Sequence, residues 1–343
     1  MSDVILAKAG RAGRITLNRP EALNALTHEM CLAIEAALDD WADDPDVALV
    51  LIEGAGERAF SAGGDIAVMY ETGTSGDYSY GRKFWSDEYR LNAKIAKYSK
   101  PYIAFMHGFV MGGGAGVSIH ASHRVVTEST RVAMPECGIG LVPDVGSTHL
   151  LAAAPGALGA YLGTTGTRMG PGDAIYAGFA DSFVPAGAWD ALKLRLIETG
   201  DPAEIAKAAA PSPEASLAKD QAAIDAAFTA RDHKALLANL AATDTDWARK
   251  TAETLARQSP LSAACTLQLV ARAKTGGRIE AALAQEYRFV SRCMELGDFL
   301  EGIRAQIIDK DRNPKWRHPA LGDVTQSDVE AMLAPLGAND LIL

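Results

Sequence analysis

Two short glycine-rich stretches do most to restrict the fold of this chain. They are SAGGD at Ser61–Asp65 and MGGGAG at Met111–Gly116. Each follows an apolar run of strand length and precedes a segment with helical spacing of apolar residues. Continuous apolar runs of this length are typical of parallel strands covered on both faces, and parallel strands need crossover helices between them. The alternation therefore indicates an α/β protein.

The alternation of strands and helices continues to about Val184. Apolar runs of strand length lie at residues 47–54 and 101–108, and residues 26–44 have helical spacing of apolar side chains. Thr27 precedes the first turn of that helical segment, so we expect it to be the N-cap. These elements predict a largely parallel sheet with crossover helices.

The second half of the chain has a different composition. Residues 186–256 are rich in alanine with interspersed charges, which predicts helices, and a last helical stretch ends near Pro314. We therefore divide the chain into an α/β core in residues 1–185 and a mostly helical C-terminal region in residues 186–343.

The charge of the chain restricts its binding partners. Its 343 residues carry a formal net charge of −10, which argues against a general binder of nucleic acid or of an anionic membrane. An anionic small ligand is not excluded, because a few local cations or backbone N–H groups can hold one. The four cysteines are scattered without CxxC spacing, which fits a reduced compartment. The start of the chain lacks the apolar segment of a signal peptide, so we expect a cytoplasmic protein.

The glycine-rich stretches also indicate a kind of chemistry. Glycine lets the backbone approach a ligand closely, and the N–H groups at a helix start are unpaired and carry partial positive charge. Two such groups that converge would form an oxyanion hole. The alternative is that the glycines serve only the tight packing of strand against helix. Neither stretch has the phosphate-binding pattern GxxxxGK[ST], nor GxGxxG with a ribose-binding acid at the right distance.

Two acids, Glu136 and Asp144, stand among apolar residues and glycines after the second stretch. A buried carboxylate without a partner is costly, so such acids cap helices, pair with cations or do chemistry. Asp144 lies two residues before Gly146 and is a candidate cap for the helix predicted at GSTHLL. Glu136 has neither a cap role nor a neighbouring cation in the sequence, so we interpret it as a group that acts on a substrate.

Other kinds of catalytic site are less well supported. Several histidines crowd this segment, but no His-x-x-x-His pair with a carboxylate ligand stands out, so we expect no metal. The histidines are His107, His120, His123 and His149. A serine nucleophile at Ser118 is a near miss, because GVSIH lacks the final glycine of the GxSxG motif.

Several segments of the chain resemble the enoyl-CoA hydratase/isomerase (crotonase) superfamily. They are ITLNRPEALNAL, AFSAGGDI, KPYIAFMHGFVMGGGAGVSIH and MPECGIGLVPDVGSTHLL, and the resemblance runs from about residue 3 to about residue 184. EYRFVSRCMELGDFLEGIRAQIIDKDRNPKW, FWSDEYRLN, the VPDVG segment and the total length are similar to the 3-hydroxyisobutyryl-CoA hydrolase subfamily. The resemblance implies a crotonase-like spiral of ββα repeats with an acyl-CoA site. A C-terminal helical region would complete the site and supply packing or oligomer surface.

The resemblance also implies roles for the glycine-rich stretches. The oxyanion hole would use the backbone N–H groups of Gly64 and Gly113 to hold the thioester oxygen of an acyl-CoA. Ala62 and Ile66 would meet the adenine end of CoA through their backbone. Hydratases have a catalytic glutamate at the position of Gly116, so this acid is absent here.

The remaining implied roles fall on three acids. The second hydratase glutamate corresponds to Glu136, which would be the nucleophile or the general base on water. The additional aspartate of the hydrolase subfamily corresponds to Asp144, which would protonate the departing thiolate or orient the substrate hydroxyl. Glu88 would hydrogen-bond that hydroxyl. The loss of one glutamate at Gly116 and the gain of Asp144 favour hydrolysis over hydration.

The implied reaction is hydrolysis of 3-hydroxyisobutyryl-CoA, or of a close 3-hydroxyacyl-CoA, in valine breakdown. It needs no metal, and CoA enters only as part of the substrate. The alternatives are enoyl-CoA hydration or isomerisation, and a non-catalytic acyl-CoA binder. The small-molecule substrate is the expected partner, with neither nucleic acid nor membrane, and the resemblance leaves a homo-oligomer open.

Overall fold

The computed structural model describes residues 2–229 and 232–343. The chain forms two compact units, each assembled from three separate segments. Unit 1 comprises Met1–Asp65, Asp87–Ala133 and Arg168–Ala218, and unit 2 comprises Ile66–Ser86, Met134–Thr167 and Lys219–Leu343. The sequence boundary at residue 185 stays a prediction about composition, because neither unit is one continuous stretch.

The main sheet of unit 1 has six strands in the order β1-β2-β3-β5-β7-β9. Their bounds are β1 Val4–Ala9, β2 Ala12–Leu17, β3 Leu49–Gly54, β5 Tyr102–Met106, β7 His123–Val126 and β9 Ser182–Phe183. The β1–β2 pair is antiparallel and every other pair in this sheet is parallel, so the predicted parallel arrangement is confirmed. Strand β1 was not predicted, although it begins with the short apolar run VILA; it is an edge strand in which only Val4 is buried.

A second, three-stranded parallel sheet has the order β4-β6-β8. Its strands are β4 Ala59–Ser61, β6 Phe109–Met111 and β8 Arg131–Ala133. Along the chain, each long strand is followed by a short one and then by a helix. The three repeats are β3-β4-α2, β5-β6-α4 and β7-β8-α5, with α2 at Ala67–Thr74, α4 at Gly113–Gly116 and α5 at Ser147–Ala153. This order confirms the expected ββα repeats.

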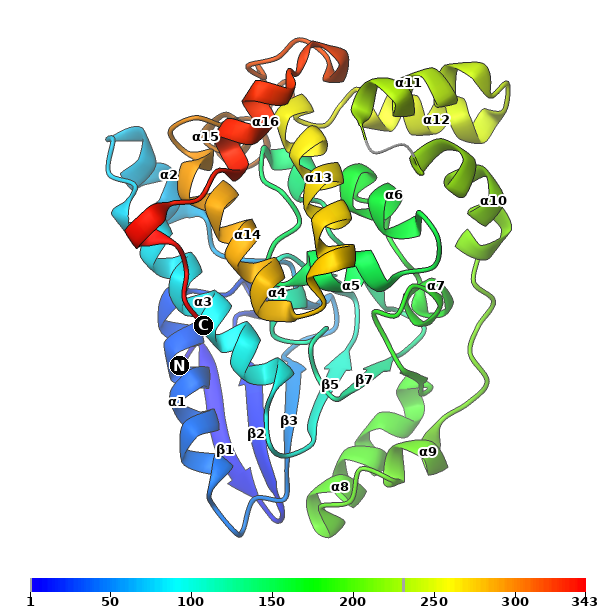
Figure 1. Ribbon diagram of the computed structural model, residues 1–343. Helices are drawn as coiled ribbons and strands as arrows, with labels where there is room; N and C mark the ends of the chain where they lie inside the picture. The colour runs from blue at the N-terminus through cyan, green and yellow to red at the C-terminus, as the bar shows by residue number, and fades with distance from the viewer. Residues whose placement is uncertain (1, 230–231) are drawn as a thin grey trace. The chain divides into compact units, whose positions relative to one another are not determined.

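Helices pack against the main sheet of unit 1, among them α8 and α9, which are drawn in green at the lower right of Figure 1. These helices, Trp189–Thr199 and Glu204–Ala208, bury Trp189 and Leu192 in one apolar cluster with Leu51 and Phe105 of the sheet. Unit 1 also contains α4, α1 at His28–Ala42 and α7 at Pro171–Tyr176, while α3 spans Ser79–Ala96. The predicted cap of α1 is confirmed, because Thr27 Oγ1 accepts a hydrogen bond from Met30 N at 3.2 Å.

Unit 2 is helical and is organised around α13, which is buried on most of its surface. Besides α2 and α5, its helices include α6 Leu158–Thr165, α10 Leu217–Phe228, α11 His233–Ala242, α12 Asp246–Leu255, α13 Pro260–Gly276, α14 Ile279–Cys293, α15 Phe299–Ile303 and α16 Gln326–Leu333, together with the π-helix η4 Arg304–Ile308. Helix α13 packs against α5, α6, α14 and α16 (Figure 1). The prediction of helices after residue 186 is therefore confirmed, with an irregular link between α9 and α10.

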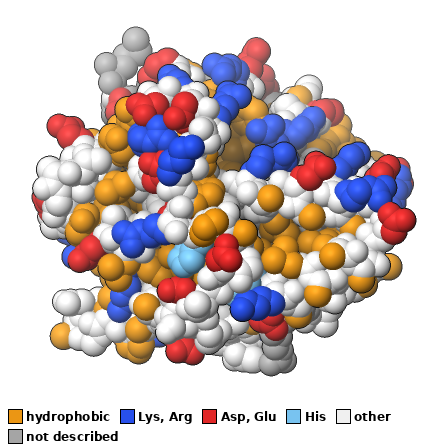
Figure 2. All heavy atoms as spheres, turned by 90° about the horizontal axis from the view of Figure 1, so that it is seen from above, with side chains coloured by type: hydrophobic (Ala, Val, Ile, Leu, Met, Phe, Trp, Pro, Cys, Tyr) orange, Lys and Arg blue, Asp and Glu red, His pale blue; other side chains and the backbone are white. Residues whose placement is uncertain are grey.

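Within the described ranges, we find no helix with the length and apolar character needed to cross a membrane. Figure 2 shows several groups of Lys and Arg side chains on one face of the molecule, beside acids and apolar side chains. Cationic areas therefore exist on the surface despite the net charge of −10.

Candidate active site

The two glycine-rich loops of unit 1 are held in place by backbone contacts. Gly64 pairs with Leu26 in a parallel bridge, in which Leu26 N donates to Gly63 O at 2.9 Å and Asp65 N donates to Leu26 O at 2.7 Å. Gly63 has a φ of +125°, a conformation that favours glycine. The Asp65 carboxylate pairs with the Arg19 guanidinium at 3.0 Å, which anchors the end of the loop.

The two predicted oxyanion glycines lie next to each other. Helix α4 begins at Gly113, as the prediction of a helix start requires. A Cβ built on Gly113 would lie 3.3 Å from Gly64 N and 2.5 Å from Glu88 Oε1. The structure therefore brings Gly64, Gly113 and Glu88 together inside unit 1, and the buried Glu88 lies on α3.

The packing alternative applies to the next residue, Gly114. A Cβ there would lie 2.5 Å from Ser61 Oγ and 2.7 Å from Ser61 O, so α4 packs on β4 only because this residue is glycine. Neighbouring glycines of the same motif thus have different surroundings. Gly114 faces a strand, and Gly113 faces a carboxylate and a backbone nitrogen.

The two predicted CoA-contacting residues fall in different units. Ala62 is half-buried in unit 1, and its N–H donates to Leu23 O at 3.0 Å. Ile66 is the first residue of the unit 2 segments and occupies the N-cap position of α2. Their contact with adenine stays a prediction.

Glu136 and Asp144 both belong to unit 2, and each is 4% exposed. Glu136 is the first residue of the 3-10 helix η2, Glu136–Ile139. Among the described residues, Glu136 Oε2 has no hydrogen-bond partner. An acceptor oxygen that is buried in this way is costly unless a substrate or a proton occupies it.

The C-terminal helices fix the element that carries Glu136. Ser259 N donates to Cys137 O at 2.9 Å, and the Cys137 thiol lies 3.3 Å from the Thr266 hydroxyl. A Cβ on Gly302 of α15 would overlap the carbonyl of Ile139. Two segments more than 100 residues further along the sequence therefore pack against η2.

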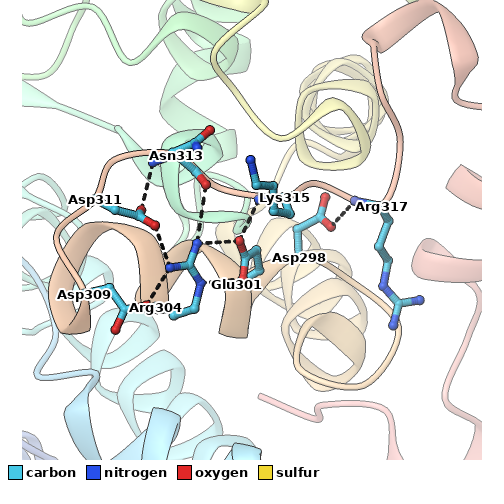
Figure 3. A network of polar contacts seen from close by, with 8 residues as sticks. All are labelled: Asp298, Glu301, Arg304, Asp309, Asp311, Asn313, Lys315 and Arg317. Carbon is cyan, nitrogen blue, oxygen red and sulfur yellow. Dashed lines mark hydrogen bonds and ion pairs between the residues drawn. The ribbon is translucent and has the colours of Figure 1, made fainter.

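A network of polar contacts links α15 to the segment that follows it in the chain (Figure 3). The Arg304 guanidinium bonds to Glu301 at 2.8 Å, Asp309 at 2.6 Å and Asp311 at 2.8 Å. Hydrogen bonds from Arg304 are the main reason that the pKa values of Glu301 and Asp311 are lowered. Asp298 accepts from Arg317 N at 2.9 Å and from the Ser259 hydroxyl at 2.7 Å. The segment IRAQIIDKDRNPKW, quoted above for the resemblance, thus supports the residues that hold η2.

Asp144 begins a tight turn before α5. Ser147 N donates to Asp144 O at 2.9 Å, and both residues of the turn have positive φ, +54° at Val145 and +81° at Gly146. A β-branched residue in this conformation is strained. The predicted helix is confirmed, but its N-cap residue is Gly146.

The carboxylate at the start of α5 comes from Glu286, a residue of α14 that the sequence analysis missed. Glu286 Oε2 accepts from Gly146 N at 2.7 Å, and Oε1 accepts from Thr148 N at 3.0 Å and from the Thr148 hydroxyl. Its partners are about 140 residues away in sequence, so no local pattern indicates them. One signal was available: Glu286 lies on the apolar stripe of α14, between Leu283 and Phe289.

Three buried acids of unit 2, Glu136, Asp144 and Glu286, influence one another. Burial raises the pKa of Glu136 well above its ordinary value, and the charges of Asp144 and Glu286 raise it further. Burial likewise raises the pKa of Glu286 to about 8, although its hydrogen bonds from Thr148 and Gly146 lower it. Carboxyl groups coupled in this way titrate as a set. The set can hold a proton beside a carboxylate at neutral pH, which general acid–base chemistry requires.

The other candidate chemistries receive less support. Ser118 is fully buried and its hydroxyl donates to Gly114 O at 2.8 Å, so it completes a helical turn of α4. Within residues 2–229 and 232–343, no group of three or more His, Cys, Asp or Glu side chains is placed to hold a metal ion.

Known proteins are similar to this chain over nearly its whole length. The family profile described as enoyl-CoA hydratase/isomerase matches residues 12–333. The mitochondrial 3-hydroxyisobutyryl-CoA hydrolase of Danio rerio is 39% identical over 355 residues, which cover 100% of this chain and 92% of the relative. The protein of the same name from Homo sapiens is 36% identical, over 99% of this chain and 90% of the relative.

Solved structures give the same fold. An enoyl-CoA hydratase from Rhodobacter sphaeroides 2.4.1 is 50% identical with a TM-score of 0.95, and the match covers 100% of both chains. A carnitinyl-CoA dehydratase from Mycobacterium thermoresistibile is 42% identical with the same TM-score, over 100% of this chain and 99% of the other. These matches confirm the expected α/β fold, including the C-terminal helical region.

The relatives correct one prediction. The curated proteins described above are named as mitochondrial, so the prediction of a cytoplasmic protein is wrong. The physical reason is that short targeting segments set the compartment of a protein. Cysteine usage and net charge describe the folded part, and they are a poor guide to compartment.

Proposed function

Because the chain belongs to the enoyl-CoA hydratase/isomerase family, we propose that it hydrolyses the thioester of 3-hydroxyisobutyryl-CoA to 3-hydroxyisobutyrate and CoA. The curated relatives that match the whole chain carry this activity in their names. The observation on this chain that carries the proposal is the buried pair Glu136 and Asp144, combined with glycine at position 116. In valine breakdown such a step would release the free acid.

In this proposal the backbone N–H groups of Gly64 and Gly113 stabilise the negative charge that develops on the thioester oxygen. Glu88 accepts a hydrogen bond from the 3-hydroxyl group of the acyl chain. Its support is the position of its carboxylate against Gly113. A substrate whose hydroxyl reaches Glu88 would then have its carbonyl beside the two glycines.

Glu136 supplies the attack. In one route its carboxylate adds to the thioester carbonyl carbon, the C–S bond breaks and a mixed anhydride forms, which water then hydrolyses. In the other route Glu136 takes a proton from water, and the resulting hydroxide attacks the carbonyl. In both, Asp144 protonates the departing thiolate, and one water is consumed for each thioester cleaved. Both acids are buried, and the raised pKa of Glu136 makes its ionised form a stronger base and nucleophile than an exposed glutamate.

A second candidate function is enoyl-CoA hydration, because the 50% identical structure bears that name. Gly116 argues against it, since glycine offers no carboxylate to the water. The test incubates the protein with 3-hydroxyisobutyryl-CoA and with crotonyl-CoA, and follows free thiol and the enoyl absorbance separately. We expect thiol release and little hydration. Fast hydration without thiol release would reverse the assignment, and tight binding without either reaction would indicate a non-catalytic acyl-CoA binder.

We further propose that the chain forms a homo-oligomer, as the resemblance allows. The helical region of residues 186–343 would supply the surface. Sedimentation of the purified protein measures this directly, and a monomer at micromolar concentration would contradict it.

A further inference from the structure

We propose that Glu286 is a positioning residue of the hydrolytic site, which clamps the turn Asp144–Thr148 from α14 and thereby directs the Asp144 side chain. This inference rests on the function proposed above. It concerns a residue that does not touch the thioester. Its effect passes through the backbone that carries Asp144.

The clamp consists of three hydrogen bonds on one fully buried carboxylate. Gly146 N donates to one oxygen at 2.7 Å, while Thr148 N, at 3.0 Å, and the Thr148 hydroxyl donate to the other. The donors bracket the first turn of α5, directly after Asp144. Both oxygens of Glu286 therefore accept hydrogen bonds from the segment Gly146–Thr148.

The turn needs such a clamp because it is strained. Val145 has a φ of +54° although it is β-branched, and it is 1% exposed. Strained residues of this kind persist only where the surroundings hold them in place. Because Val145 follows Asp144 directly, relaxation of this strain would rotate the backbone on which the Asp144 carboxylate is mounted.

A purely structural role predicts different consequences for the same substitutions. Glu286→Gln keeps the shape but replaces one acceptor oxygen by an NH₂ group, which must then face an N–H donor. Thr148→Val keeps the volume and removes only the hydroxyl donor. Thr148→Ser keeps the donor and removes a methyl group. If packing alone matters, the valine variant behaves like wild type and the serine variant is the weaker one.

The experiment measures kcat and KM for thiol release from 3-hydroxyisobutyryl-CoA in Glu286→Gln, Thr148→Val and Thr148→Ser. Glu330→Gln, the same change at an exposed position of α16, is the control. We expect Glu286→Gln to lower kcat by about 10- to 100-fold with KM little changed, since misplacement of a reacting group by about 1 Å has such effects. Thr148→Val should lower kcat and Thr148→Ser should restore it.

A second measurement needs no substrate. Amide hydrogen exchange of the peptide covering residues 141–149 should be faster in Glu286→Gln than in wild type, and unchanged in Glu330→Gln. Normal kcat together with normal exchange in Glu286→Gln would overturn the proposal, as would a fully active Thr148→Val beside a weak Thr148→Ser. If wild type releases no thiol, the proposed hydrolase function fails. In that case unchanged exchange in Glu286→Gln refutes the clamp, and faster exchange supports it.

Discussion

Single alanine substitutions at Gly113 and Gly114 should distinguish a catalytic role from a packing role in the second glycine-rich stretch. In Gly113→Ala, the new Cβ would lie 2.5 Å from Glu88 Oε1, where an ordinary contact lies at 3.4–4 Å. The Glu88 carboxylate must therefore retreat by about 1 Å, a displacement that can cost about 10²-fold in rate. The new methyl group would also stand 3.3 Å from Gly64 N, on the face where the thioester oxygen is proposed to bind.

Gly114→Ala meets a different obstacle. Its Cβ would lie 2.7 Å from a backbone oxygen, Ser61 O, so the strand itself must move. Overpacking of this kind destabilises a protein by about 1–3 kcal/mol. We expect a lower Tm for Gly114→Ala, and a nearly unchanged Tm with greatly reduced kcat for Gly113→Ala. Gly187→Ala is the control, because its Cβ would have no neighbour within 4 Å.

The assay is thiol release at saturating 3-hydroxyisobutyryl-CoA, paired with a thermal melt of each variant. A folded Gly113→Ala enzyme that turns over within about threefold of wild type would refute the reasoning, since a misplacement of about 1 Å at the site can cost about 10²-fold in rate. An equal loss of Tm in Gly113→Ala and Gly114→Ala would show that both glycines only pack.

Three further predictions concern the acids. Glu136→Gln and Asp144→Asn should each lower kcat by about 10²-fold or more at nearly constant Tm. The double variant should be hardly slower than the worse single variant, because the effects of residues that act as a unit do not add. Losses in kcat that add in the double variant would contradict this. Glu88→Gln should raise KM for the 3-hydroxy substrate more than for the acyl-CoA without the hydroxyl, and equal effects on both would exclude the assigned contact. Since burial raises the pKa of Glu136 well above its ordinary value of 4.5, the folded state keeps a proton that the unfolded state loses, and this contribution to stability falls as pH rises above 4.5. Tm should therefore fall less steeply with rising pH in Glu136→Gln than in wild type, and equal pH profiles of Tm would contradict the raised pKa.

Local patterns in the sequence predicted the elements that depend on local physics. The cap at Thr27 follows from a side chain that bonds three residues ahead. The start of α4 at Gly113 follows from glycines after a buried strand. Glu136 and Asp144 were identified because burying an ionised carboxylate among apolar residues costs free energy unless it has a partner or a function. Each of these inferences uses a span of a few residues.

Long-range contacts account for what the sequence did not reveal. Glu286 bonds to residues about 140 positions away, and an acid on an otherwise apolar helix face has no partner that a local pattern can name. The two units are each built from three separated segments, whereas composition suggested one boundary at residue 185. The roles of Ala62, Ile66 and Glu88 stay predictions, since they depend on where a substrate lies.

The network around Arg304 has a consequence for synthesis on the ribosome. The element carrying Glu136 is made early, but the partners that fix it, Ser259 and Gly302, emerge much later. The hydrogen bond from Arg317 N to Asp298 can form only after residue 317 has been made. A nascent chain thus contains Glu136, the proposed nucleophile or general base, long before the segments that hold its backbone in place are made. We therefore expect that a chain terminated before residue 298 lacks thioesterase activity, even though it retains all the acids and glycines that are proposed to act on the substrate.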